Sequence, residues 1–178
     1  MRRIMLVLVS VAVGLSLASG MALAAVTFVS GGKIDQVKIA REDNMQATNS
    51  PSFVNIPNTQ VGVVVPSGTT RLVMARFSAE SVCWGSWGGW CSIRIVAQNN
   101  ATGAITEMQP ASGEDFAFDS TDQNQETELS WESHSMDRSI RLTAGSYTIR
   151  PQWEFQGASR DLSHFELDDY SLTVERAL

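Results

Sequence analysis

The clearest structural signal in the chain is the run Thr70-Arg71-Leu72-Val73-Met74-Ala75-Arg76-Phe77-Ser78. Val73, Ala75 and Phe77 fall on one face of an extended strand, because successive side chains in a strand point to opposite sides. One apolar and one polar face per strand is typical of an antiparallel sheet. The run therefore predicts a half-buried β-strand.

The same alternation recurs on both sides of this run. Ile93, Ile95 and Ala97 share one face, and the residues from Tyr147 to Arg150 alternate in the same way. Helical periodicity is nearly absent, whereas β-branched and aromatic runs are frequent. The chain predicts strands at Val26–Val29, Gln36–Ala40, Ser52–Ile56, Gln60–Val65, Thr70–Ser78, Ser92–Ala97, Phe116–Phe118, Ser130–Asp137, Ser139–Leu142, Tyr147–Gln152 and Phe165–Glu175.

Turn residues separate several of these runs. Pro66-Ser67-Gly68 divides two strong strands, Asn99–Gly103 is typical of a hairpin tip, and Thr143-Ala144-Gly145 forms another short connection. Many short strands at this spacing predict an all-β fold. We expect an antiparallel β-sandwich, with a jelly roll as its topology.

The N-terminus carries the features of a secretory signal peptide. Arg2 and Arg3 precede the apolar run Ile4–Leu17, and Ala22-Leu23-Ala24 supplies the small residues of a cleavage site. We expect residues 1–24 to be removed and residues 25–178 to form a single β-sandwich domain. The alternative is a membrane anchor, but the apolar run is shorter than the roughly 20 residues that a span needs. The mature chain should therefore have no integral membrane segment, and the signal indicates a secreted protein or one on the exterior of the cell envelope.

The two cysteines, Cys83 and Cys91, bound a loop rich in glycine and tryptophan. In an exported protein, such a pair predicts a disulfide rather than a metal or redox site. Two free buried thiols are the alternative.

Three tryptophans, Trp84, Trp87 and Trp90, lie inside this loop with glycines between them. Rigid aromatic rings dominate many contact surfaces, so the loop predicts a ligand-binding platform. The alternative is that one or more rings fold back to cap the core beside the disulfide.

The net charge of −6 becomes −8 when Arg2 and Arg3 are removed with the signal. An acidic chain with scattered charges is unsuited to nucleic acid and to anionic membrane surfaces.

Two segments resemble extracellular β-sandwich families. Phe165-Glu166-Leu167-Asp168-Asp169-Tyr170-Ser171-Leu172-Thr173-Val174 resembles the closing strand of galactose-binding-like jelly rolls, a class that includes many carbohydrate-binding modules. Leu142–Ile149 resembles a Leu-x-Ala-Gly-x-Tyr turn and strand of such sandwiches. The whole chain also resembles uncharacterised secreted bacterial β-sandwich proteins that pair a Cys-bounded Gly/Trp loop with this ending.

The resemblance implies a structural calcium ion held partly by Asp168 or Asp169. Glu42, Asp43 and Asn44 are possible further ligands by analogy with jelly-roll calcium sites, since Ca²⁺ takes six to eight oxygens. Asp168-Asp169 also interrupts the apolar alternation of its strand, which predicts a bulge or corner there. The alternative is a solvated acidic corner.

The remaining polar residues do not form a recognisable catalytic motif. A second acidic group, Glu114, Asp115, Asp119 and Asp122, does not match an EF-hand and predicts a solvated loop. Ser133, His134 and Asp137 have the atoms of a catalytic triad, but Ser133 and His134 are adjacent on a strand and point to opposite faces. His134 and His164 are the only histidines, which disfavours a zinc site.

These features favour a non-catalytic module that binds an extracellular or cell-wall glycan through Trp84, Trp87 and Trp90. The alternative is a protein–protein module acting in adhesion, inhibition or envelope assembly. A small secreted hydrolase is disfavoured because no nucleophile, base and orienting group come together.

Overall fold

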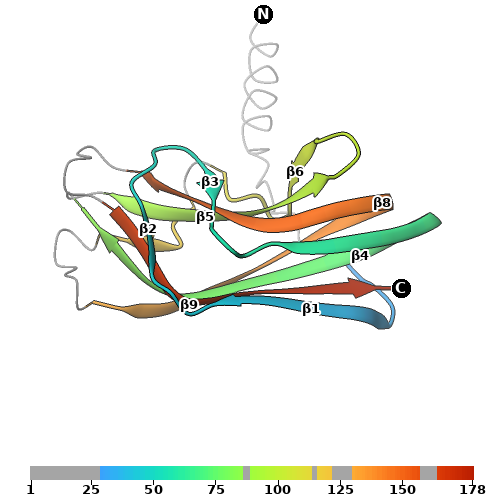
Figure 1. The fold of residues 1–178 in the computed structure, drawn as a ribbon, viewed down its shortest axis with the longest axis horizontal. Helices are drawn as coiled ribbons and strands as arrows, with labels where there is room; N and C mark the ends of the chain where they lie inside the picture. The colour runs from blue at the N-terminus through green and yellow to red at the C-terminus, as the bar shows by residue number, and fades with distance from the viewer. Residues whose placement is uncertain (1–28, 86–88, 114–115, 122–129, 157–163) are drawn as a thin grey trace, which may run out of the picture.

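A computed structural model of the chain describes residues 29–85, 89–113, 116–121, 130–156 and 164–178. In these ranges the regular elements are all β-strands, as the alternation predicts (Figure 1). Their bounds are β1 Ile34–Glu42, β2 Gln46–Thr48, β3 Val54–Asn55, β4 Val61–Trp84, β5 Trp90–Asn99, β6 Ile105–Glu107, β7 Asp119–Ser120, β8 Glu132–Gln156 and β9 His164–Ala177.

Two long strands, β4 and β8, run through both layers of the molecule. Val61–Val65 of β4 pairs with Gly145–Ile149 of β8, whereas Thr70–Ser81 pairs with Glu132–Thr143. Figure 1 shows both strands turning back at one end and passing from the lower layer to the upper layer. The lower sheet has the order β1-β9-β4-β8 and the upper sheet has the order β4-β8-β5-β6. Two antiparallel sheets connected in this way form the expected β-sandwich, and the jelly-roll topology stays a prediction.

The corner between the two halves of β4 is formed by local turn residues. Between Val65 and Thr70 the register with β8 shifts, because β4 advances five residues while β8 moves two, from Gly145 to Thr143. Pro66 has no N–H to donate to a ladder, and Gly68 has φ +69°, a region that glycine enters without strain. The predicted turns at Pro66–Gly68 and Thr143–Gly145 are therefore the two sides of one corner.

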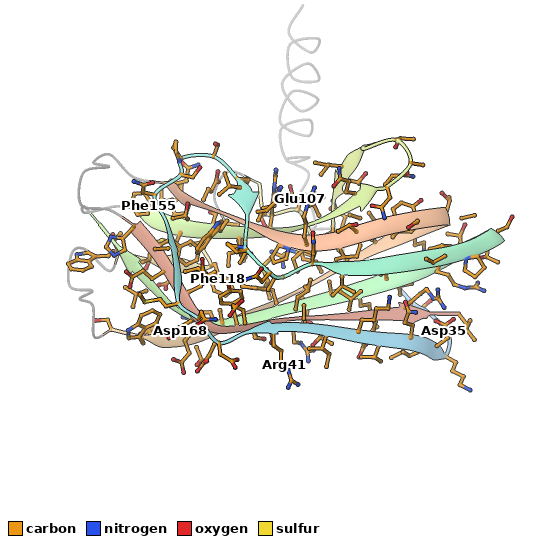
Figure 2. All side chains as sticks on the ribbon, viewed as in Figure 1. Asp35, Arg41, Glu107, Phe118, Phe155 and Asp168 are labelled. Atoms are coloured by element: carbon orange, nitrogen blue, oxygen red, sulfur yellow. A yellow bond between two sulfur atoms is a disulfide. The ribbon has the colours of Figure 1, made fainter. Side chains whose placement is uncertain are left out.

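The core fills the space between the two sheets. Val73, Ala75 and Phe77 from β4 are buried, as predicted from their alternation. The predicted inner residues of β5 and β8 are buried with them: Ile93, Ile95, Ala97, Tyr147 and Ile149. Phe77 lies 5.9 Å from the ring of Phe118, which Figure 2 places between the sheets.

The predicted disulfide closes the end of the sandwich opposite the corner. Cys83 of β4 and Cys91 of β5 are fully buried and bonded, with Cα atoms 5.8 Å apart. Because Cys83 is in the lower sheet and Cys91 is in the upper sheet, the bond ties the two layers together.

The predicted bulge at the aspartates is also confirmed. In the pairing of β4 with β9, Ser78 lies opposite Ser171 and Glu80 lies opposite Asp168, so Ala79 faces two residues. Asp169 has φ +44°. The extra residue turns Tyr170, Leu172 and Val174 to the same buried side as Phe165 and Leu167.

Strand boundaries and the shortest strands differ from the prediction. The two strands predicted within residues 60–78 are one strand, as are the three predicted within residues 130–152. Phe116–Phe118 is not a strand; the chain pairs with β5 on either side of it, at β6 and β7. β2, β6 and β7 are two or three residues long. Such strands are too short to show alternation in the sequence, so their formation depends on pairing with a longer strand.

Gly89 is where the cysteine loop rejoins the fold, and it has no room for a side chain. A Cβ there would lie 3.0 Å from Thr121 Cγ2, 3.1 Å from Phe155 Cζ and 3.2 Å from the Gln156 carbonyl oxygen. We predict that Gly89→Ala destabilises the fold by about 1–3 kcal/mol, because overpacking forces its neighbours to move. Gly62→Ala is the control, since its Cβ would meet nothing within 4 Å. Chemical denaturation of both variants measures the difference; equal stabilities would contradict this packing.

Candidate functional site

The two loop tryptophans that the structure describes, Trp84 and Trp90, lie on different sheets. The bonded side chains of Cys83 and Cys91 point inward, so the neighbouring Trp84 and Trp90 point to the outer sides of β4 and β5. Trp84 is 37% exposed. Trp90 is half-buried, and its Nε1 is buried without a hydrogen-bond partner among the described residues. The structure thus does not bring Trp84 and Trp90 together, and Trp87 lies outside the described residues.

Trp84 forms a cluster with His164 and Glu166, here called the Trp84 cluster. Trp84 and His164 are register partners on β4 and β9, and their ring centroids are 5.1 Å apart. His164 Nε2 lies 3.0 Å from Glu166 Oε1. No pattern in the sequence predicts this set. Its only signal was the i, i+2 spacing of His164 and Glu166, which places both side chains on one face of a strand.

The Trp84 cluster belongs to the outer face of the lower sheet. Further along that face, Ser78 of β4 lies directly between Ser135 of β8 and Ser171 of β9. In the next row, Arg76 lies between Asp137 and Thr173. The face therefore carries an exposed indole at one end and a row of short hydroxyl side chains at its middle. Figure 2 shows Arg41 and Asp168 projecting from this same side of the lower sheet, away from the core.

A pocket of about 190 Å³ opens on this face beside the hydroxyl row. It is called the Arg76 pocket here, and its lining comes from three neighbouring strands: Met74, Ala75, Arg76, Asp137, Thr173 and Glu175. Arg76 Nε donates to Asp137 Oδ1 over 2.8 Å.

The carboxylates proposed as calcium ligands lie where β1 ends beside the bulge in β9. Glu42 accepts hydrogen bonds from the side chains of Asn44 and Asn58 over 2.5 and 2.7 Å, and these bonds lower its pKa. Burial, followed by the charges of Glu42 and Asp168, raises the pKa of Tyr170 to about 12. Glu42 is also the register partner of Tyr170 on the neighbouring strand.

No three His, Cys, Asp or Glu side chains gather closely enough to hold a metal in the described part of the chain. Calcium can also use carbonyl and amide oxygens, so binding at Asp168, Asp169, Glu42 and Asp43 stays a prediction, which a calcium titration would test.

His134 takes part in a contact that the sequence does not predict. Ser133 and His134 do face opposite ways, as their register partners Glu80 and Ala79 show. His134 Nδ1 lies 3.4 Å from Ser81 Oγ, and its Nε2 lies 3.2 Å from Glu132 Oε2.

This serine–histidine contact is closed to substrate. Ser81 is fully buried, and its hydroxyl donates to Asp119 Oδ2 over 2.5 Å. Asp119, the described member of the second acidic group, is therefore a buried structural carboxyl rather than part of a solvated loop. Glu114, Asp115 and Asp122 lie outside the described residues.

A second polar group covers the outer face of the upper sheet around Arg94. Its Nε donates to Gln152 Oε1 over 2.8 Å, its guanidinium lies 4.2 Å from the Phe53 ring centroid, and Glu107 lies 3.7 Å away. Figure 2 shows Glu107 on this upper side. Burial raises the pKa of the neighbouring Glu154 carboxyl. Because these groups bond mainly to one another, they serve to hold the segment around Phe53 onto the sheet.

Comparison with known proteins gives distant structural similarities. No protein-family model matches the chain, and no curated protein matches its sequence. A chain in the structure of infectious bursal disease virus, Gx strain, has a TM-score of 0.47 and 12% identity, over 80% of this chain and 32% of the viral chain. This chain thus spans about a third of the viral chain's length.

Two bacterial structures are also similar. The dimeric latent PorU of Porphyromonas gingivalis has a TM-score of 0.34 and 10% identity, over 84% of this chain and 14% of PorU. The CBM22-1 xylan-binding domain of Paenibacillus barcinonensis Xyn10C has a TM-score of 0.30 and 6% identity, over 82% of this chain and 96% of that domain. At these TM-scores the structural similarity gives no information about a ligand of this chain.

The ranges that the structure describes contain no helix that is long and apolar enough to cross a membrane.

Asp119 gives the fold a pH dependence that can be measured. Burial raises its pKa, against the hydrogen bonds from Ser81 and Ser120. A carboxyl whose pKa is raised by folding stabilises the native state at low pH, and that contribution is lost as the pH rises through the folded-state pKa. Asp119→Asn stays neutral and keeps an oxygen for the Ser81 hydroxyl. We therefore predict that the melting temperature of Asp119→Asn rises relative to wild type between about pH 4 and pH 7. A difference that is constant with pH would show that Asp119 is not the responsible group.

Proposed function

We propose that the protein is a secreted, non-catalytic binding module for extracellular or cell-wall glycan, with Trp84 as its principal contact. The observation that carries the proposal is the exposed Trp84 ring, held against His164 beside the buried disulfide. Trp87, in the same loop, is proposed as a further contact, and the half-buried Trp90 as a lesser one.

The chemistry of the Trp84 cluster suits a sugar ring. An indole offers a flat apolar face to C–H groups and a polar edge, at a low cost in conformational entropy. His164 and Glu166 lie within reach of the same surface and can exchange hydrogen bonds with hydroxyl groups. The neighbouring disulfide restricts the strand end that carries Trp84, so little order is lost on binding.

The non-catalytic part of the proposal rests on the burial of the serine–histidine contact. A nucleophile must reach its substrate, whereas the Ser81 hydroxyl is fully buried and already donates to Asp119.

A protein partner is the second candidate, in adhesion, inhibition or envelope assembly. It is favoured by Val37 and Ile39, which are 54% and 50% exposed on β1. β1 ends the order of the lower sheet, and an edge strand can pair with another chain.

Retention on insoluble polysaccharide tests the proposal. We predict that Trp84→Ala weakens binding by about tenfold or more, as loss of a central aromatic contact does. The variant should still fold but lose some stability, because the ring is 37% exposed and its covered part and its contact with His164 are removed. Ile105→Ala is the matched control, since Ile105 is 51% exposed on the upper sheet.

Full retention by a folded Trp84→Ala variant would contradict the glycan assignment at this site. Capture of a defined protein partner that is lost on changing Val37 and Ile39 to serine would favour the second candidate instead.

A further inference from the structure

The Arg76 pocket is distinct from the Trp84 cluster, although both lie on the outer face of the lower sheet. Arg76 and Trp84 are eight residues apart on β4, which corresponds to about 26 Å along a strand. With about 190 Å³, the pocket is smaller than the 300–1,000 Å³ sites that enclose drug-sized ligands. It therefore suits one chemical group or one ring, rather than a length of polymer.

The charges of the pocket leave one carboxylate uncompensated. Arg76 is paired with Asp137 over 2.8 Å, so these two charges largely cancel. Glu175, on the opposite side of Met74 from Ser139, makes no ion pair and no side-chain hydrogen bond within the described ranges. A half-buried Met74 and the Thr173 hydroxyl complete the lining. The pocket thus combines an apolar floor, a hydroxyl and a net negative charge.

The residues beside the Arg76 pocket indicate what chemical groups the rest of the ligand carries. The row Ser135, Ser78 and Ser171 begins one outward position away along the strands, about 6.6 Å from the row of Arg76. Each serine hydroxyl both donates and accepts hydrogen bonds, which matches a polyhydroxylated molecule. Glu80 and Asp168 pair directly across the strands beyond this row, and Arg41 of β1 lies opposite Ser171 at one end of it.

We propose that the Arg76 pocket binds the positively charged amino group of an amino sugar, with Glu175 as the counter-charge and the serine row as hydrogen-bond partners for the adjoining sugar. This inference rests on the proposed glycan function and names the class of glycan: a chain that contains free amino groups. The ammonium donates to the Glu175 carboxylate and to Thr173 Oγ1, and the sugar ring covers Met74. A charge-assisted hydrogen bond of this kind is about twice as strong as a neutral one.

Two oligosaccharides that differ in one substituent test the proposal. Hexaglucosamine carries free amines, and hexa-N-acetylglucosamine has the same backbone with neutral amides. By titration calorimetry with the full protein at about pH 5.5, where carboxylates are ionised and amines are charged, we predict about tenfold tighter binding of hexaglucosamine. Glu175→Gln should abolish that preference without affecting the melting temperature. Glu80→Gln, an exposed carboxylate on the same face but outside the pocket, should retain it.

The outcomes separate this inference from the proposed function. Equal binding of the two oligosaccharides, both weakened by Trp84→Ala, would overturn the amino-group site and leave the glycan function standing. Preference for hexaglucosamine that survives Glu175→Gln would also overturn it. Hexalysine that binds as tightly as hexaglucosamine would show that charge alone is recognised, again contradicting the proposal. Binding of neither oligosaccharide would overturn the inference, whereas the glycan function is decided separately by retention on insoluble polysaccharide.

Discussion

The pairing of β4 with β8 is the interaction on which the rest of the structure depends. The same two strands pair in both sheets, with β8 at the edge of the lower sheet and β4 at the edge of the upper sheet, so neither sheet can form without fixing the other. The corner at Pro66–Gly68 and Gly145 sets the angle between them. The position of the core follows from this arrangement, because the alternation along each strand then directs its apolar residues into the space between the sheets.

The open sides of the sandwich are closed by other means. The disulfide joins the sheets at the end away from the corner, and in the chain-entropy model a loop of this size contributes about 2.5 kcal/mol. Along one edge, the Lys38 ammonium donates to the Gly62 carbonyl over 2.6 Å, and Arg176 donates to the Val64 carbonyl. These cations cover backbone acceptors that an edge strand would otherwise expose. The outer face of the lower sheet is left open, and both proposed binding sites lie there.

Much of this could be predicted from the sequence, because it depends on local patterns. Alternation identified the buried faces of β4, β5 and β8, and the break in alternation at Asp168-Asp169 identified the bulge. The site depends instead on register, which no local pattern reveals. His164 is 80 positions from Trp84, yet it becomes its cross-strand neighbour only through the pairing of β9 with β4. Likewise, the buried hydrogen bond between Ser81 of β4 and Asp119 of β7 depends on the pairing of β7 with β5.

Native-state hydrogen exchange tests the central claim, that the two sheets form one cooperative unit through β4 and β8. The account predicts that the amides of Val73–Phe77 in the lower sheet and Tyr147–Ile149 in the upper sheet exchange with the same, highest free energy. That value should equal the global free energy of unfolding. It should fall equally for both groups of amides when the disulfide is reduced. Two groups that exchange with different free energies, one for each sheet, would contradict the claim.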